Sequence, residues 1–162
     1  LGARGVLVPP TASVFSAFGI CSSDCLHIAE ESVLLMPPWD VEAMVQRLER
    51  LSEEVAVQLE SEGATRATMS IEHSLDLRYR GQVHEVGVPL LVAGGGVAAA
   101  IERLEAAFHD EYVRLYGKES TVAGWPIEAI AMRVEGRFNP HRHEFVSYPP
   151  GPPASDGARK GV

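Results

Sequence analysis

Hydrophobic residues recur at intervals of three and four in two stretches of the chain, and this spacing is typical of amphipathic helices. The clearer stretch covers residues 40–62, where Asp40 can cap the start of a helix and Gly63 can follow its end. The other stretch begins at Gly94-Gly95-Gly96 and ends at Gly117. The positions expected to face the core are Val41, Met44, Val45, Leu48, Leu51, Val55 and Leu59 in the first helix, and Val97, Ala100, Ile101, Leu104, Phe108, Tyr112 and Leu115 in the second.

Apolar and polar residues alternate with a period of two in residues 67–79, which predicts a half-buried strand. The alternation continues in residues 82–90 after Arg80-Gly81, so these two strands are expected to form a tight hairpin. Pro89 has no N–H to donate and is expected near a strand end or on a sheet edge. Two further strands are expected at residues 26–35 and 127–134, and a short helix within residues 11–21.

From residue 26 the predicted order of elements is strand, helix, strand, strand, helix, strand. This is the order of the ferredoxin-like split βαβ arrangement. The predicted fold class is therefore α+β, with one antiparallel four-stranded sheet and two helices packed on one of its faces.

Composition places this chain among ordinary globular domains, with 162 residues, 46% hydrophobic and 22% charged. The net charge of −8 disfavours nucleic acid as a partner. RNA-recognition modules share the predicted element order, but they need aromatic residues on their central strands, and residues 26–35 and 82–90 have none. No apolar run is long enough to span a membrane. The chain does not begin with Met, and we expect it to be part of a longer protein.

Two features could bind ligands but have simpler structural interpretations. Gly94-Gly95-Gly96 before a helix could cradle an anion, but it lacks the spacing of a nucleotide-binding motif, so a flexible connection is favoured. Cys21 and Cys25 lie four residues apart with His27 nearby, and burial as structural thiols is favoured over metal binding. Two cysteines are too few for a disulfide framework, which fits a reducing cytoplasm.

The end of the chain is rich in proline and is expected to be an extended tail or linker from residue 139 onward. His141, His143 and Glu144 lie in this tail and could hold a metal ion. A metal site needs a rigid set of supporting contacts, so an adventitious cluster is the favoured interpretation.

The densest group of polar residues is the string DLRYRGQ. Strand alternation puts Asp76, Arg78 and Arg80 on one face and Tyr79 on the other, where the ring can anchor in the core. The guanidinium group is a rigid fork of donors for carboxylates or phosphates, and Gln82 offers both a donor and an acceptor. Structural or interface use is favoured over ligand binding, because exposed ion pairs are common and weak.

This string also carries a resemblance to a known family. The chain resembles the hydantoinase A/oxoprolinase family, which includes N-methylhydantoinases, 5-oxoprolinases and acetone and acetophenone carboxylase subunits. Its most specific motif is Arg-Tyr-x-Gly-Gln, here Arg78, Tyr79, Gly81 and Gln82. The other matching stretches are VLVPPTASVFSAFGICSSD, FHDEYVRLYG and IEAIAMRV, in the same order and spacing as in the family.

The resemblance implies three parts. Residues 1–24 resemble the closing strand and helix of an actin-like ATPase domain, in which Ser16, Ala17 and Gly19 match a Ser-Ala-x-Gly turn. Ser13 stands where the family usually has glycine, which puts a close backbone approach there in doubt. Residues 25–138 would be the ferredoxin-like C-terminal domain, and residues 139–162 the tail.

The resemblance further implies an ATP-dependent, amidohydrolase-type enzyme that opens a cyclic amide such as a hydantoin or 5-oxoproline. A subunit of an ATP-dependent ketone carboxylase and a non-catalytic assembly or ligand-binding module remain the alternatives. ATP and Mg²⁺ would bind to upstream motifs, so no catalytic residue, cofactor or metal is expected in this chain. The expected partners are the upstream ATPase domain and a hydantoinase B-like subunit, and the expected localisation is cytoplasmic. Asp76, Arg78, Tyr79, Gly81 and Gln82 are the interface or substrate-proximal candidates.

Overall fold

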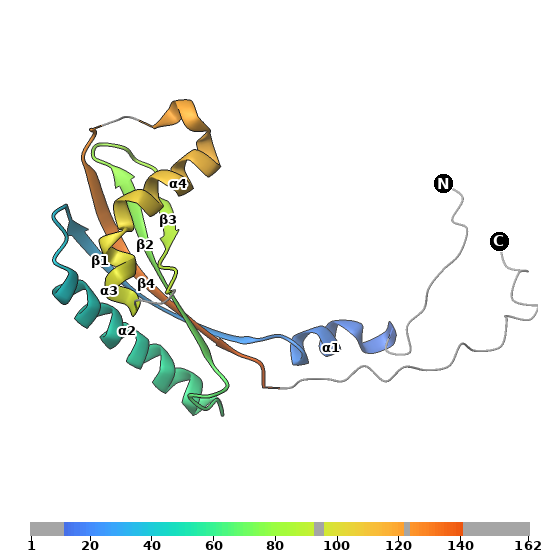
Figure 1. Cartoon of the computed structure of the whole chain (residues 1–162). Helices are drawn as coiled ribbons and strands as arrows, with labels where there is room; N and C mark the ends of the chain where they lie inside the picture. Colours follow the sequence, from blue (N-terminus) through green and yellow to red (C-terminus); the bar gives the residue numbers. More distant parts are fainter. Residues whose placement is uncertain (1–11, 93–95, 122–123, 141–162) are drawn as a thin grey trace, which may run out of the picture. The chain divides into compact units, whose positions relative to one another are not determined.

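The computed structural model describes residues 12–92, 96–121 and 124–140 (Figure 1). The described residues belong to two compact units, which are residues 12–22 and residues 23–140. Within these ranges, none of the helices is both long and apolar enough to cross a lipid bilayer. Residues 1–11 of the segment expected to close the ATPase domain, and the His141, His143 and Glu144 cluster, lie outside the described residues.

The short unit is a single turn of 3-10 helix, Ala12–Val14, followed by helix α1, Phe15–Cys21. The predicted short helix is therefore confirmed. Ser16, Ala17 and Gly19 all lie in α1, and all three residues are exposed.

The described residues of the larger unit form four strands and three α-helices. The strands are β1 (Cys25–Leu35), β2 (Ser70–Tyr79), β3 (Val86–Pro89) and β4 (Ile127–Phe138). The helices are α2 (Val41–Ser61), α3 (Gly96–Glu102) and α4 (Leu104–Tyr116), with a 3-10 turn at Lys118–Ser120. Asp40 accepts a hydrogen bond from the Ala43 N–H at 3.1 Å, and Gly63 has a φ of 99°, so both predicted ends of α2 are confirmed.

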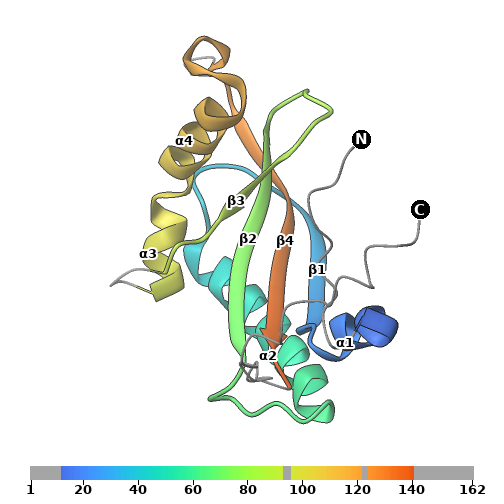
Figure 2. The same cartoon turned by 90° about the vertical axis from the view of Figure 1, so that its right-hand side faces the viewer.

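All neighbouring strands of the sheet are antiparallel, in the order β1-β4-β2-β3 (Figure 2). The antiparallel four-stranded sheet is as predicted, and Pro89 ends an edge strand, also as predicted. A ferredoxin-like sheet has its first and third strands in the centre, whereas here β4 and β2 are central. Alternation along a strand shows which face is buried but not which strands are neighbours, so the sequence could not reveal this order.

The helices of the larger unit pack on one face of the sheet. On β2, His73 contacts Ser52 of α2 and Tyr79 contacts His109 of α4, and residues 73 and 79 of one strand share a face. The helix positions that are fully buried include Met44, Leu48, Leu51, Val55 and Leu59 of α2 and Ile101, Leu104 and Phe108 of α3 and α4. Among the residues that the structure describes in this unit, no helix covers the other face of the sheet.

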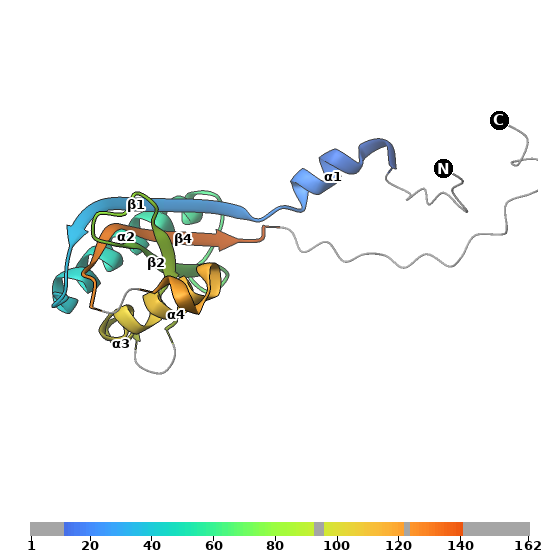
Figure 3. The ribbon, with the colours of Figure 1, turned by 90° about the horizontal axis from the view of Figure 1, so that it is seen from above.

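Three sequence predictions need correction. The predicted second helix is two helices, α3 and α4, because the chain breaks at Arg103 (Figure 3). Leu115 of that helix, expected to face the core, is exposed. The tight hairpin at Arg80-Gly81 is wrong, since β3 begins only at Val86. The expected burial of the cysteines is also wrong, because Cys21 is exposed and Cys25 only partly covered.

Candidate functional site

The strand β2 ends in the Arg-Tyr-x-Gly-Gln motif, and the backbone there forms a turn. Gly81 has a φ of 89°, a conformation that glycine adopts without strain. The Gln82 N–H donates to the Tyr79 carbonyl at 3.0 Å, which closes the turn. The turn leads into a six-residue loop, residues 80–85, before β3 begins.

A second segment braces this turn from the start of β4. The Arg80 N–H donates to the Pro126 carbonyl at 2.8 Å. The Trp125 indole N–H donates to the Arg80 carbonyl at 3.2 Å, while about half of the Trp125 residue stays exposed, at 52%. The backbone of Arg80 is therefore fixed on both sides, and its exposed side chain is free to reach outward.

Tyr79 anchors the site in the core. It is 1% exposed and packs edge-on against Phe108 and Tyr112 of α4, with ring centroids 5.1 Å and 4.9 Å away. Its hydroxyl lies 3.1 Å from Nδ1 of His109. A buried tyrosine is stable only when its hydroxyl finds such a partner, so the ring and the hydroxyl together fix the angle between β2 and α4.

Gln82 is held against the same helix. Its side-chain amide donates to the Tyr112 hydroxyl at 3.1 Å. Arg78 makes a different contact on the opposite face of β2, where its Nε donates to the Glu128 carboxylate at 2.7 Å. The turn at Gly81 separates Gln82 from Arg78, because strand alternation alone would put residues 78 and 82 on the same face.

The Arg78–Glu128 pair lies on the face of the sheet without helices. The two residues are directly opposite on β2 and β4, beyond a bulge at which β4 has one extra residue. The side chain of Glu128 is only 8% exposed and that of Arg78 is 29% exposed. Removing the guanidinium would leave a buried carboxylate unpaired, which is costly.

Asp76 lies on the same face, two residues before Arg78. It pairs with Arg133 at 3.0 Å, and Arg133 also pairs with Glu30 of β1. Burial raises the pKa of the Asp76 carboxyl, while the charge of Arg133 opposes this shift. The five candidate residues are thus divided between a core-side turn and a chain of ion pairs across the sheet.

Two cavities flank the turn. One, of about 340 Å³, is lined by Gln82, Val83, His84, Tyr112 and Tyr116. The other, of about 380 Å³, is lined by Met36, Pro37, Glu105, His109, Gly124, Trp125, Pro126 and Ile127. Their walls combine aromatic rings, imidazoles and an amide, which suits binding or docking rather than covalent chemistry. Within the three described ranges, no group of three or more His, Cys, Asp or Glu side chains is placed to hold a metal ion.

Sequence reasoning missed several residues of this site. Glu128 interrupts the apolar run at the start of the last strand. A carboxylate within such a run indicates a buried charge that needs an oppositely charged partner, and Glu128 is indeed buried. His109 and Trp125 gave no comparable signal, because their contacts with residues 79 and 80 join segments that are far apart in the sequence.

Comparisons with known proteins agree on one family. The Hydantoinase/oxoprolinase C-terminal domain model matches residues 39–160. The acetone carboxylase beta subunit of Xanthobacter autotrophicus is 26% identical over 144 residues, which is 82% of this chain and 20% of that protein. An uncharacterised protein of Schizosaccharomyces pombe is 33% identical over 82 residues, covering 50% of this chain and 6% of its own length.

Two solved structures resemble this one. A nucleotide-free acetone carboxylase has a TM-score of 0.70 at 21% identity, over 81% of this chain and 20% of that one. The ATP-dependent caprolactamase of Pseudomonas jessenii has a TM-score of 0.67 at 23% identity, over 89% of this chain and 21% of that one. At these identities the likeness shows the fold. The chain spans about a fifth of the length of the acetone carboxylase and caprolactamase chains.

Proposed function

Since this chain belongs to the hydantoinase/oxoprolinase family through its C-terminal domain, we propose that it is the C-terminal part of an ATP-dependent enzyme that hydrolyses a cyclic amide. The observation that carries the proposal is the family match over residues 39–160. The likeness in fold to a caprolactamase, whose name denotes a cyclic amide substrate, supports this reaction class. ATP and Mg²⁺ would bind to an upstream ATPase domain, to which α1 with Ser16, Ala17 and Gly19 would belong.

Within that enzyme, the larger unit would serve assembly. Three segments expose large apolar side chains at this end of the domain: the loop before β3 exposes Val83 at 79%, the end of α4 exposes Tyr116 at 53%, and the segment before β4 exposes Trp125 at 52%. Large apolar groups beside arginine and histidine side chains are typical of protein–protein interfaces. We assign this end of the domain, with Arg80 and Gln82, as the surface that docks on the ATPase domain or on a hydantoinase B-like subunit.

The enzymatic proposal is tested with the full-length protein and its neighbouring subunit. ATP hydrolysis is measured in the presence of hydantoin, 5-oxoproline, a lactam or a ketone, and the products are identified. The proposal expects ATP turnover coupled to ring opening of at least one cyclic amide. Turnover with ketones alone would contradict it.

A ketone carboxylase is the second candidate, because the acetone carboxylase beta subunit is 26% identical over most of this chain. The two reactions differ in their need for an inorganic carbon source. If ATP turnover requires both a ketone and bicarbonate and yields a carboxylated product, the carboxylase is correct. Ring opening without bicarbonate supports the hydrolase.

The docking surface is tested by expressing this chain and the upstream part of the protein as separate polypeptides. Trp125→Ala should reduce their association. Leu91 is a matched control, because it is 73% exposed and lies outside the residues that line either flanking cavity. Equal effects of Trp125→Ala and Leu91→Ala would contradict the assignment.

A further inference from the structure

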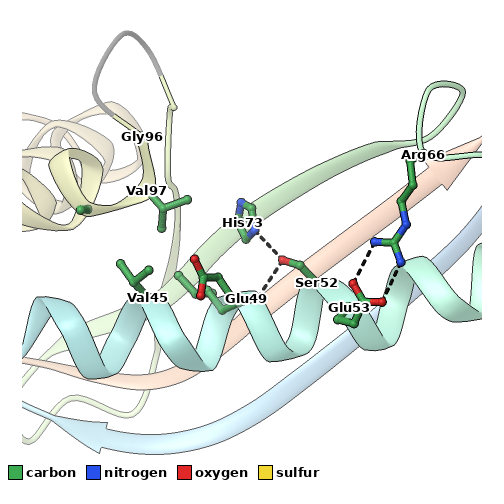
Figure 4. Close-up of a pocket in the computed structure, with 10 residues that line it drawn as sticks. Val45, Glu49, Ser52, Glu53, Arg66, His73, Gly96 and Val97 are labelled. Carbon is green, nitrogen blue, oxygen red and sulfur yellow. Dashed lines mark hydrogen bonds and ion pairs between the residues drawn. The ribbon is translucent and has the colours of Figure 1, made fainter.

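A third cavity of the larger unit lies away from the Arg-Tyr-x-Gly-Gln turn, between α2, β2 and the start of α3 (Figure 4). Its volume is about 530 Å³, which is within the usual range for small-molecule sites. The walls are apolar where α2 and α3 approach each other and polar towards β2. The lining residues are Val45, Leu48, Glu49, Ser52, Glu53, Arg66, His73, Gly96, Val97 and Ala98.

The hydrogen bonds of Ser52 determine what His73 can offer a ligand. The single hydroxyl hydrogen of Ser52 is donated to the Leu48 carbonyl at 2.7 Å. Nε2 of His73 lies 2.8 Å from the same hydroxyl oxygen, so this nitrogen must carry the hydrogen of that bond. Burial lowers the pKa of His73 and favours the neutral ring, whose Nδ1 is then a hydrogen-bond acceptor. Ser52 is correspondingly not activated as a nucleophile, because its hydrogen does not point to the imidazole.

The charged groups of the cavity leave one carboxylate available. Arg66 is held by both carboxylate oxygens of Glu53, at 2.9 Å and 2.7 Å, and by Glu60 at 2.6 Å. Glu49 is exposed and makes no hydrogen bond or ion pair with any other described residue. In Figure 4 its carboxylate rises from α2 on the side where His73 and Val97 lie.

The cavity thus offers acceptors, namely the Glu49 carboxylate and His73 Nδ1, beside an apolar wall of Val45, Leu48 and Val97. A matching ligand must bring hydrogen-bond donors and positive charge at one end and a short aliphatic chain at the other. We propose that this cavity binds an aliphatic primary ammonium ion, with the ammonium group on Glu49 and His73 and the carbon chain along α2 and α3. The proposal stands apart from the proposed enzyme activity.

The test is titration of the purified chain with n-pentylammonium, followed by NMR and calorimetry. We expect saturable binding that perturbs the signals of Ser52, His73 and Val97. Pentanoate has the same chain with the opposite charge and should not bind. Methylammonium lacks the chain and should bind more weakly than n-pentylammonium. The ammonium group of the ligand could belong to an amino acid or to a simple amine, and 5-aminopentanoate distinguishes the two. If 5-aminopentanoate binds more tightly than n-pentylammonium, the ligand class is an amino acid. If it binds more weakly, the ligand class is a simple amine.

Two variants locate the site. Glu49→Gln keeps the size of the side chain and removes its charge, and it should weaken n-pentylammonium binding roughly tenfold, as expected for a charge-assisted hydrogen bond. Glu54→Gln is the matched control, because Glu54 is an exposed carboxylate on the same helix outside the cavity. Binding of pentanoate as tight as that of n-pentylammonium, absence of binding at millimolar concentrations, or equal effects of the two variants would overturn the proposal.

Discussion

Gly136 lies in β4 on the face that α2 covers, and replacing it with alanine is a sharp test of how the helix sits on the sheet. A Cβ atom at this position would lie 2.3 Å from Cγ1 of Val55 and 2.9 Å from Cδ1 of Leu59. Both neighbours are buried, at 2% and 0% exposed, so neither side chain can turn into solvent. Valine is also restricted to few side-chain rotamers in a helix, which leaves movement of α2 itself as the main relief.

The expected cost follows from these distances. Carbon atoms pack at about 3.5–4.0 Å, so α2 must shift by roughly 1 Å to admit the methyl group. Overpacking of this kind costs about 1–3 kcal/mol, which exceeds the gain of about 0.4–1 kcal/mol from a less flexible unfolded chain. We therefore expect Gly136→Ala to lower the free energy of unfolding by about 1–2 kcal/mol, measured by urea denaturation of the purified chain.

A double mutant separates this clash from other effects. Val55→Ala removes Cγ1 and leaves Cβ of residue 55, which lies 3.7 Å from the added Cβ in an ordinary contact. The double mutant should therefore be more stable than the sum of the two single effects predicts, by about 0.5–2 kcal/mol. Additive effects, or a harmless Gly136→Ala, would show that α2 does not approach β4 at this point.

Three further predictions concern the site and the cavity. Tyr79→Ala removes a buried ring and should cost about 3–5 kcal/mol of unfolding free energy, while Arg78→Lys keeps a positive charge beside Glu128 and should change stability much less; the reverse pattern in urea denaturation would mean that the two faces of β2 are wrongly assigned. The folded-state pKa of His73 is lowered, so the wild type should lose stability as pH falls from about 6.5 through that lower value, and His73→Gln should flatten this part of the pH profile. The chain should give no heat of Mg²⁺-ATP binding in calorimetry, and micromolar affinity would refute the assignment of the nucleotide site to an upstream domain.

The elements that the sequence predicts well have strong local signals. The apolar stripe of α2 has a helical period between an aspartate cap and a glycine, and both ends lie where these residues predict. The alternation before Tyr79 likewise identifies the buried face of β2. In both elements the spacing of the apolar residues that form the core matches the period of the secondary structure, so core packing and local structural propensity favour the same conformation.

The parts that the sequence does not predict depend on distant contacts. No proline or glycine marks the break at Arg103, and local periodicity continues through it. The loop after Gly81 has the alternation of a strand, yet Pro126 and Trp125 hold the backbone of Arg80 in a turn, and strand pairing begins only at Val86. The pairing of Arg78 with Glu128 requires β4 to lie beside β2, which is a property of the sheet order.

The arrangement of β2 connects these observations with the proposed role in assembly. Its core-facing side chains extend from His73, at the large cavity, to Tyr79, at the exposed turn, and its other face carries the paired charges of Asp76 and Arg78. β4 pairs with β2 along its whole length, from Ser70 to Tyr79, and β3 pairs with the middle of β2, from Ser74 to Leu77. The Gln82 side chain is held by Tyr112 and the Arg80 backbone by Pro126 and Trp125, so in the proposed role a docked partner would have fewer groups to order, which lowers the entropic cost of association. Under the two proposals, the same strand carries a docking surface at one end and a small-ligand cavity at the other.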